Sequence, residues 1–580
     1  MRGAMGYFLG LFGYGPNPSA ALVRDGSIVA FAEEERFNRI KTAPSSLPVS
    51  ALLYCLREAG IGIEDVEGIG FGWECDRYVE AMPAFYEQFR RQYPQPDNEY
   101  NLLQEVYLLN LYHPARIRAD LRQALALRGV YLEPERVRFL PHHLCHAASS
   151  YYCSSFAEAS ILTLDGSGEE YSTVMWHGAG ERIKELRSFR LPHSLGGYYA
   201  TFTEFLGFKA NQDEGKLMGL APYGQHSAAI QAKLDHILPY DPSTGEFEVN
   251  PYMRYLGHRA WGRRFTDRFV ELFGRPRLGH QPIEAHHRDL AFNVQWRLEQ
   301  IAQGLVRTLI GMTGARSLCL AGGVAMNCCM NGKLSLMEEV REIFVQPASS
   351  DNGIALGAAY LMARQAGVSI FEPLRHAYWG PAFSDGEVEA AIRESKLPYR
   401  RSAIVVEEVA RDLAEGKIVG WLQGRMEVGA RALGNRSILA SPLFPDMRDR
   451  LNREVKHRES WRPFCPSLPT DDYRTYFDHG VDSDYMILAY SVRPEFHARI
   501  PSVVHVDGTA RPQTVHPEQN PKFYALLKAF GRLTGHPVLI NTSFNVQGEP
   551  IVCTPADALR CFGGTGLDVL VLNDFVLTKP

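Results

Sequence analysis

Two segments of this chain repeat one pattern of strand, glycine-bearing turn, strand, turn and strand. The first spans Tyr7–Phe31, where Asp25-Gly26 is a strong hairpin dipeptide, and the second spans Ile161–Phe189. Sequence with helical spacing follows each segment. Hairpins are common, so chance similarity is the alternative, but the repeat favours two related lobes in an α/β fold.

The length of 580 residues exceeds what one ordinary core supports. We expect a first domain over residues 1–370 and a second α/β domain over residues 400–580. Residues 371–399 contain Pro373 and Pro381 and have no strong hydrophobic period, so a linker is expected there.

Composition narrows the range of partners and compartments. A net charge of -5 gives no general reason to expect a nucleic acid partner. Ten cysteines without a CxxC pair argue against a zinc ribbon or a disulfide framework and favour a reducing cytoplasm. We expect no membrane helix, because no stretch approaches the roughly 18 apolar residues that such a helix needs.

The stretch Pro141–Glu169 combines two chemistries. His142 and His146 are four residues apart, so on a helix they lie on one face and can share a ligand. The strand that follows ends at Asp165 in the turn DGSGE, whose backbone amides can approach a phosphate. Asp351, in SSDNG before another helix, would join these three as a metal ligand. The alternative is a structural histidine pair, with Asp351 as an N-cap.

Three further segments are candidates for binding phosphate-containing ligands. The strand-glycine-glycine turn AGGVAMN (321–327) is weak evidence alone. Eight arginines fall between Arg425 and Arg462, and glycines and aromatics are interleaved with them in the segments QGRMEVGARALGNR and KHRESWRPFCP. Arginine suits phosphate and carboxylate groups, whereas a solvated face would favour lysine alternating with acids. In HPVLINTSFNVQGEP, Asn541 and Ser543 follow a strand and would bind phosphate or a carbamoyl group; a local turn explains that segment equally well.

Ten motifs, in one order and nearly from end to end, resemble those of the O-carbamoyltransferases of the nodulation-factor and antibiotic type. They are AFAEEERF (30–37), HHLCHA (142–147), LDGSGE (164–169), EGKLMGLAPYG (214–224), GGVAMN (322–327), SDNG (350–353), GARALGNRSIL (429–439), VKHRESWRPFCPS (455–467), RPQTV (511–515) and NTSFN (541–545).

The resemblance implies an N-terminal domain of the actin/Hsp70/sugar-kinase type, with two ribonuclease-H-like lobes, and a YrdC-like C-terminal domain. It implies an ATP-dependent carbamoyltransferase that makes carbamoyl-adenylate from carbamoyl phosphate and ATP in the C-terminal domain. The adenylate would pass inside the protein to the N-terminal domain, where a hydroxyl of a sugar, antibiotic or other natural product accepts the carbamoyl group.

The resemblance also implies roles for individual residues. Carbamoyl phosphate and ATP would be held by Arg431, Lys456, Arg462, Arg511, Asn541 and Ser543, with Lys41 as a further cofactor-binding residue. Gly323 and Asn327 would contact the adenylate. A divalent metal, Fe²⁺ or alternatively Mg²⁺, would be bound by His142, His146, Asp165 and Asp351. The catalytic residues would be His142, His146, Arg431 and Lys456.

The sequence departs from the family pattern at two places. Pro16 and Asn17 stand where the family has a histidine and an acidic residue, and Thr42 stands where a histidine usually follows the lysine. The missing histidine is a candidate base, so the acceptor and its base stay open. A homodimer is among the expected assemblies. The alternatives are a transferase of the tRNA threonylcarbamoylation type, which the acidic charge disfavours, an actin-like ATP-dependent kinase, and a nucleotide-gated interaction protein.

Overall fold

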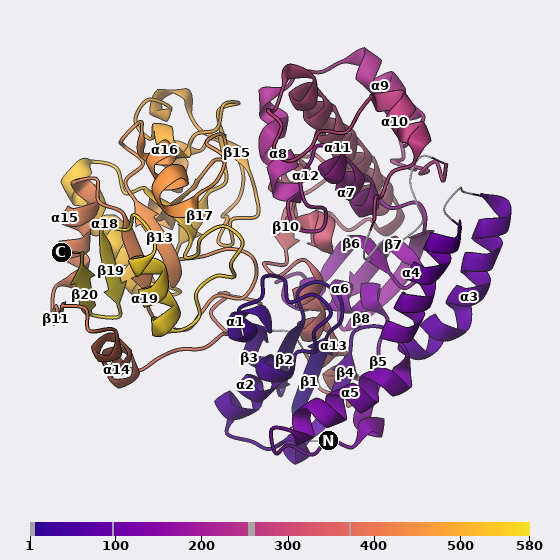
Figure 1. Ribbon diagram of the computed structural model, residues 1–580, viewed down its shortest axis with the longest axis horizontal. Coiled ribbons are helices and arrows are strands. Elements are labelled where there is room, and N and C mark those ends of the chain that lie inside the picture. Colours follow the sequence, from indigo (N-terminus) through magenta and orange to yellow (C-terminus); the bar gives the residue numbers. More distant parts are fainter. Residues whose placement is uncertain (1–5, 95–97, 253–261, 371–372, 580) are drawn as a thin grey trace. The chain divides into compact units, whose positions relative to one another are not determined.

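The computed structural model describes residues 6–94, 98–252, 262–370 and 373–579 (Figure 1). The chain forms two compact units. The first contains residues 1–34 and 42–374, and the second contains residues 35–41 and 375–580. The chain therefore passes between the units three times.

The expected linker over 371–399 is partly structured. Residues 371 and 372 lie outside the described part, and the second unit begins at Arg375. Helix α14 (Asp385–Ser395) forms inside the range, and Ser384 and Glu387 make a capping box at its start. Each of these two residues satisfies an amide of the first turn, which is why a helix begins there.

The first unit contains two five-stranded sheets. The first sheet has the order β3-β2-β1-β4-β5. Its strands are β1 (Tyr7–Phe12), β2 (Ser19–Arg24), β3 (Ser27–Glu33), β4 (Val66–Phe71) and β5 (Val137–Phe139). Strand β2 is antiparallel to β1 and β3, whereas β1, β4 and β5 are parallel. Asp25 and Gly26 join β2 to β3 with φ values of 52° and 87°, as a tight hairpin requires.

The second sheet repeats this arrangement. Its strands are β6 (Glu158–Gly168), β7 (Tyr171–Ala179), β8 (Arg182–Arg190), β9 (Ser317–Ala321) and β10 (Glu342–Val345), in the order β10-β9-β6-β7-β8. Strand β7 is antiparallel to β6 and β8, and β6, β9 and β10 are parallel. Each strand thus has a counterpart in the first sheet, so the predicted duplication and the α/β class are confirmed.

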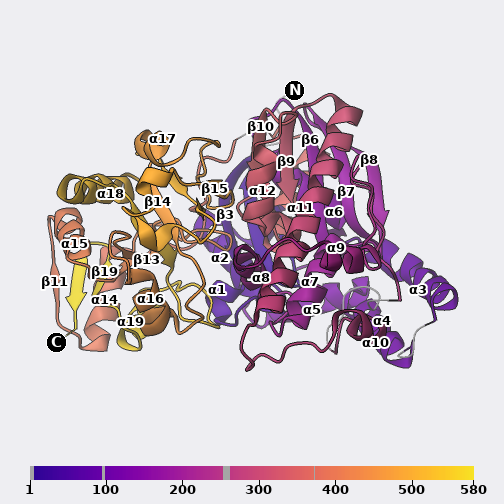
Figure 2. The same cartoon turned by 90° about the horizontal axis from the view of Figure 1, so that it is seen from above.

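Helices cover these sheets. Helix α13 (Ile354–Gln365) packs on β1, β2, β4 and on α6 (His142–Tyr151), and α11 (Ala285–Thr313) packs on β6 (Figures 1 and 2). Gly10 of β1 lies so close to α13 that an added Cβ would sit 1.8 Å from the Ala355 carbonyl oxygen. The remaining helices of this unit are α2 (Val49–Ala59), α3 (Cys75–Gln92), α4 (Asn98–Leu111), α5 (Pro114–Ala126), α7 (Leu195–Phe205), α8 (Glu214–Leu220), α9 (Ala228–Asp235), α10 (Asp267–Phe273) and α12 (Cys328–Ser335).

The second unit has an eight-stranded mixed sheet in the order β11-β20-β19-β12-β13-β18-β14-β17. The strands are β11 (Tyr399–Arg401), β12 (Val419–Leu422), β13 (Arg436–Ala440), β14 (Cys465–Pro469), β17 (Gln513–Val515), β18 (Leu539–Ser543), β19 (Val569–Leu572) and β20 (Phe575–Thr578), and a separate pair is β15 (Tyr490–Ser491) and β16 (Thr509–Ala510). A buried apolar cluster, which includes Trp421, Leu539 and Phe530, joins this sheet to α15 (Val405–Ala414) and α18 (Pro521–Thr534). The other helices are α1 (Glu35–Asn38), α16 (Met447–Leu451), α17 (Tyr473–Tyr476) and α19 (Pro555–Gly563).

The short segment Glu35–Lys41 belongs to the second unit although its neighbours in sequence belong to the first. Arg36 Nη2 donates to the Gly429 carbonyl (2.8 Å), and Arg39 Nη1 donates to the Ile551 carbonyl (2.7 Å). Arg39 also pairs with Asp557 at 3.4 Å. Across the described residues, no helix combines the length and apolar character needed to span a bilayer.

Candidate functional site

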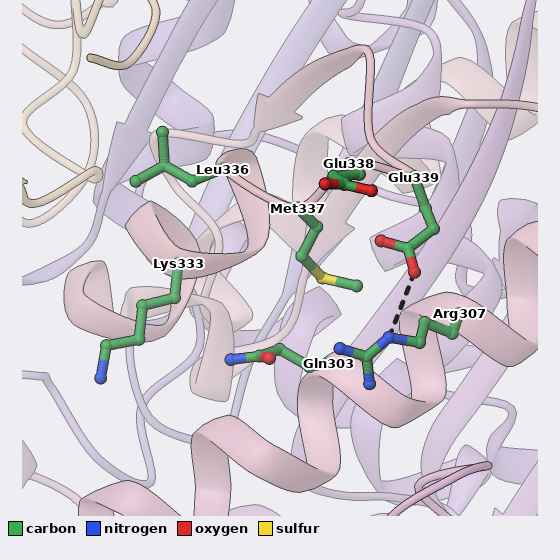
Figure 3. A pocket seen from close by; sticks show the side chains of 7 residues that line it. All are labelled: Gln303, Arg307, Lys333, Leu336, Met337, Glu338 and Glu339. Carbon is green, nitrogen blue, oxygen red and sulfur yellow. Dashed lines mark hydrogen bonds and ion pairs between the residues drawn. The ribbon is translucent and has the colours of Figure 1, made fainter.

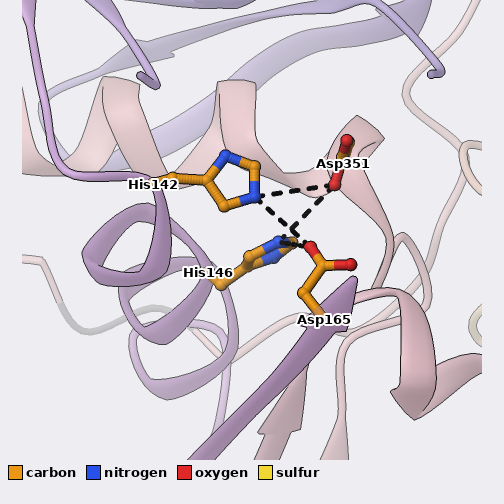
Figure 4. A group of neighbouring side chains, drawn as sticks. All are labelled: His142, His146, Asp165 and Asp351. Carbon is orange, nitrogen blue, oxygen red and sulfur yellow. Dashed lines mark hydrogen bonds and ion pairs between the residues drawn. The ribbon is translucent and has the colours of Figure 1, made fainter. Parts of the chain in front are cut away.

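Two imidazoles and two carboxylates meet in the first unit. The four side chains are His142, His146, Asp165 and Asp351, and one ligand atom from each lies within 4.8 Å of the others (Figure 4). Asp165 Oδ2 lies 3.3 Å from His142 Nε2 and 2.9 Å from His146 Nε2. Asp351 Oδ1 lies 3.7 Å from each of those nitrogens. The structure thus brings together all four residues of the predicted metal set.

Three elements position this cluster. Helix α6 begins at His142, so the spacing of four residues places both histidines on one helical face. Strand β6 carries Asp165 toward its carboxyl end. Asp351 opens a short 3₁₀ turn before α13 and makes no side-chain cap there, because Ser350 and Gly353 occupy the N-cap positions. The alternative reading of Asp351 as an N-cap is therefore wrong.

The two carboxylates of the cluster are buried side by side. Burial alone would raise the pKa of Asp165, but hydrogen bonds from His142 and His146 outweigh it and hold that pKa well below the usual range. Burial and the neighbouring charge of Asp165 raise the pKa of Asp351 well above its usual value. A second buried negative charge is unfavourable here unless a cation or a proton accompanies it.

A second layer of contacts orients the histidines. His142 Nδ1 lies 3.3 Å from the Gly72 carbonyl, which can only accept, so Nδ1 carries a hydrogen and the ring is held with Nε2 toward the carboxylates. The neighbouring His143 points elsewhere and bonds Thr163 Oγ1 at 3.0 Å. Gly168 is packed against His142: an added Cβ would lie 2.4 Å from the ring.

The predicted adenylate contacts lie next to this cluster or near it. Gly323 N donates to Asp165 Oδ1 at 3.3 Å. Gly322, with φ of 96°, has no room for a side chain, because a Cβ would come 2.1 Å from the Leu164 carbonyl oxygen. Asn327 caps α12 by accepting from Met330 N, and its amide exchanges two hydrogen bonds with Gln295. Its contact with an adenylate stays a prediction.

A buried lysine is the centre of the second cluster, in the second unit. Lys456 is 4% exposed and ends a π-helical turn over Asn452–Lys456. Its Nζ donates to the Asn545 carbonyl (3.0 Å), to Asn545 Oδ1 (2.9 Å), to Ser543 Oγ (3.3 Å) and to the Ser543 carbonyl. The predicted residues Lys456 and Ser543 are therefore in direct contact.

Cations surround this lysine. Burial lowers the pKa of Lys456 well below its usual value, and the charges of Arg458, Arg462 and Lys41 act in the same direction. Burial, together with the charges of Arg462 and Arg511, lowers the pKa of Arg458 to about 9. Positive charges gathered closely enough to lower the pKa of Lys456 and of Arg458 form a site that a bound anion would stabilise.

Arg511, in the segment between β16 and β17, and Asn541, on β18, both lie next to Cys465. Arg511 donates to Cys465 Sγ through Nε (3.1 Å) and Nη2 (2.9 Å). Asn541 pairs with Cys465 across β18 and β14, so their side chains share one face of the sheet. Asn541 Nδ2 bonds Ser467 Oγ (3.0 Å) and Gln513 Oε1 (2.9 Å).

Arg431 lies on the loop between β12 and β13, and contacts on both sides hold this loop. Before it, the Gly429 carbonyl accepts the hydrogen bond from Arg36. After it, the backbone amides of Leu433 and Asn435 both donate to Oε1 of the buried Glu427, each at 2.7 Å. A carboxylate that collects backbone amides in this way fixes the path of the loop.

Two hollows lined by described residues are similar in size. One, of about 430 Å³, is lined by residues next to the cation cluster: Asp449, Asn452, Arg453, His457, Arg458 and Ser460. The other, of about 460 Å³, lies in the first unit between α11 and α12 (Figure 3). Its charged residues Arg307 and Lys333 are paired with Glu339 and Glu299, so it has the character of a solvated surface.

Sequence reasoning did not single out Arg458, Ser467 or Gln513. Arg458 was one of eight arginines in a run, and its burial against the Phe464 ring, 4.5 Å from the ring centroid, is a tertiary feature. Ser467 and Gln513 stand inside the family motifs FCPS and RPQTV. Their position in those motifs was the available signal, but their side-chain contacts could not be read from it.

Comparison with known proteins gives one consistent answer. The family model described as carbamoyltransferase N-terminus matches residues 8–360, and the one described as carbamoyltransferase C-terminus matches residues 410–579. An uncharacterized protein of Synechocystis sp. is 38% identical, with 99% of this chain and 97% of that protein covered. Nodulation protein NolNO of Sinorhizobium fredii is 37% identical over 97% of this chain and 78% of its own length.

More distant matches agree with these. Nodulation protein U of Rhizobium fredii is 29% identical, with coverages of 94% and 90%. Among solved structures, HypF from T. kodakarensis aligns with 63% of this chain and 48% of its own at 12% identity, with a TM-score of 0.30. A score at that level does not identify a common fold.

Proposed function

Because the chain belongs to the carbamoyltransferase family, we propose that it is an ATP-dependent O-carbamoyltransferase acting on a small molecule. Water would cleave carbamoyl phosphate into carbamate and phosphate in the second unit, and a carbamate oxygen would then attack the α-phosphorus of ATP to give carbamoyl-adenylate and pyrophosphate. A hydroxyl of the acceptor would then take the carbamoyl group at the first unit, and AMP would leave.

The buried Lys456 and its surrounding arginines are the observation that carries this proposal. Both co-substrates of the first reaction bear several negative charges, and pyrophosphate is the leaving group. Lys456 is held by Ser543 and Asn545, so its ammonium is already oriented before a phosphate arrives. Fixed cations in a dry site stabilise developing phosphate charge without having to reorganise.

The cluster in the first unit fits a divalent metal. Ligand atoms about 2.1 Å from one ion in a tetrahedral site lie about 3.4 Å apart, and the four His–Asp separations are 2.9, 3.3, 3.7 and 3.7 Å. Two imidazoles with two carboxylates favour Fe²⁺ over Mg²⁺, which prefers oxygen ligands alone. His142, His146, Asp165 and Asp351 would hold the ion, and when bound it would act as a Lewis acid toward the carbamoyl or phosphate oxygens.

The lobes and the second unit also support the assignment of fold families. Two sheets with one strand order and one antiparallel second strand are what two ribonuclease-H-like lobes of the actin type require. We assign the second unit to the YrdC-like class on the motifs around Arg431, Lys456 and Ser543. The acceptor would lie near the first hairpin, where Asn17 stands in place of the family's acidic residue. The backbone of Asn17 is left-handed (φ 58°).

One measurement tests the first reaction. The purified protein should release pyrophosphate from ATP only when carbamoyl phosphate is present. Turnover without carbamoyl phosphate, as in a kinase or a simple ATPase, would contradict the proposal, and so would no turnover at all.

Two variants test the division between the units. Arg431→Ala should abolish pyrophosphate release. His142→Ala should leave pyrophosphate release unchanged and block the appearance of carbamoylated acceptor, measured by mass spectrometry over a panel of candidate alcohols. If both variants fail at the same step, the assignment of one reaction to each unit is wrong.

A further inference from the structure

Three side chains in a row across β18, β14 and β17 form a connected hydrogen-bond set. They are Asn541, Ser467 and Gln513, and all three are at most 2% exposed. Ser467 Oγ donates to Gln513 Oε1 at 2.6 Å, and Asn541 Nδ2 donates both to Ser467 Oγ and to Gln513 Oε1. Gln513 Nε2 donates to the Leu433 carbonyl at 2.8 Å.

The direction of every bond in this set follows from its last member. A backbone carbonyl can only accept, so the NH₂ group of Gln513 must face Leu433. The oxygen of Gln513 therefore faces Asn541 and Ser467. Since that oxygen can only accept as well, the NH₂ group of Asn541 must face it, and the amide of Asn541 has a single orientation.

This orientation leaves one acceptor unused. Asn541 Oδ1 is buried and has no hydrogen-bond partner among the described residues. A buried carbonyl oxygen without a donor is costly, so such an atom is expected to meet a donor from a ligand. Ser543, one of the Lys456 contacts, is two residues further along the same strand and on the same face.

We propose that Gln513, with Ser467, is a positioning residue that turns the Asn541 oxygen toward the NH₂ group of the carbamoyl substrate. This rests on the proposed function and adds how the site would select its substrate. Phosphate oxygens are acceptors and cannot satisfy Asn541 Oδ1, whereas the carbamoyl NH₂ can. The set therefore selects carbamoyl phosphate against acyl phosphates of the same shape and charge.

Acetyl phosphate is the matching probe, because a methyl group replaces the NH₂ group and the phosphate is unchanged. Binding of both compounds to the full-length protein is measured by isothermal titration calorimetry. Carbamoyl phosphate should bind roughly tenfold to a hundredfold more tightly, since acetyl phosphate leaves the buried acceptor unpaired.

The variant Gln513→Met removes all three hydrogen bonds of the Gln513 side chain at nearly the same volume, and Ser467→Ala tests the same set if the first variant folds poorly. In each, carbamoyl phosphate should bind about tenfold more weakly and acetyl phosphate within about twofold of the unmutated protein, so that the preference largely disappears. Thr514→Val is the control: it is buried on the same strand, bonds Asp484 instead, and should keep the preference.

The proposal is overturned if the unmutated protein binds the two compounds within about twofold, or if both variants keep its preference. Pyrophosphate release by the unmutated protein is measured in parallel. A clear preference without pyrophosphate release would contradict the proposed function and leave the role of Gln513 standing. Release without a preference would contradict the role of Gln513 alone.

Discussion

The two polar clusters of this protein are opposite in charge. His142, His146, Asp165 and Asp351 bring two carboxylates and no fixed cation into one place, and burial together with the charge of Asp165 raises the pKa of Asp351. The residues around Lys456 bring together cations, and burial together with the charges of Arg458, Arg462 and Lys41 lowers the pKa of Lys456. Each arrangement is incomplete by itself: the first needs a positive ion and the second needs negative ones. The charge of a buried cluster thus indicates the charge of its ligand.

The largest expected effect is at the cationic cluster. Lys456→Met should lower carbamoyl-phosphate-dependent pyrophosphate release by about a hundredfold to a thousandfold, because an oriented cation on the phosphates is lost. Lys528→Met is the control, since Lys528 pairs with Asp472 on the outside of α18 and should have near-normal release. Equal losses in the two variants would remove the special role of Lys456.

A variant of the acidic cluster, His146→Ala, should separate metal binding from pyrophosphate release. His146→Ala should lose the bound metal, measured per chain by elemental analysis after loading with Fe²⁺, and should still release pyrophosphate. His143→Gln is the control, because His143 is buried on the same helix and bonds Thr163. Metal retained by His146→Ala would show that the four residues are not a metal site.

A smaller effect is expected from a change that touches no ligand. Gly168→Ala would place a Cβ 2.4 Å from the His142 ring and displace it, so metal affinity should fall about tenfold to a hundredfold. Gly166→Ala has open space around the added Cβ and should bind the metal normally. Calorimetric titration with Fe²⁺ under anaerobic conditions measures both variants.

The smallest effect concerns stability and pH. Burial lowers the pKa of Lys456 in the folded protein well below 10.5, its ordinary value in the unfolded chain. At a pH between the folded and the unfolded pKa, the unfolded chain therefore holds a proton that the folded chain has lost. The free energy of unfolding should therefore rise with pH through this window and level off above it. Urea titrations at several pH values check this. The rise should be weaker in Lys456→Met and in saturating inorganic phosphate; an unchanged slope in both would contradict it.

The repeated sheet could be predicted because its signal is local. Alternating apolar residues and the Asp25-Gly26 turn specify a hairpin wherever they occur, and the second copy needed only comparison along the chain. The metal set was partly predictable for the same reason: the helical spacing of His142 and His146 is local. Asp165 and Asp351 were candidates because each carries a carboxylate beside a glycine-bearing turn, but no local rule brings β6 and α13 together, so a structural histidine pair with Asp351 as an N-cap stayed open until the resemblance favoured the metal set.

Other features depend on tertiary contacts and could not be predicted. Helix α14 had a usable signal, the capping box of Ser384 and Glu387, but the prolines around it favoured a linker. The hydrogen-bond set that orients the Asn541 amide had no signal in the sequence. Asn541, Ser467 and Gln513 come from three distant segments, and only the strand order places them in one row.

The segment Glu35–Lys41 bears on how the protein is made. These seven residues leave the ribosome more than 300 residues before Arg375, where the rest of their unit begins. Arg36 and Arg39 must therefore wait until their partners Gly429, Ile551 and Asp557 have been synthesised. A single cut of the gene near residue 375 would leave Arg36 and Arg39 on one fragment and their partners on the other. A single fission at that point therefore could not separate the two units intact.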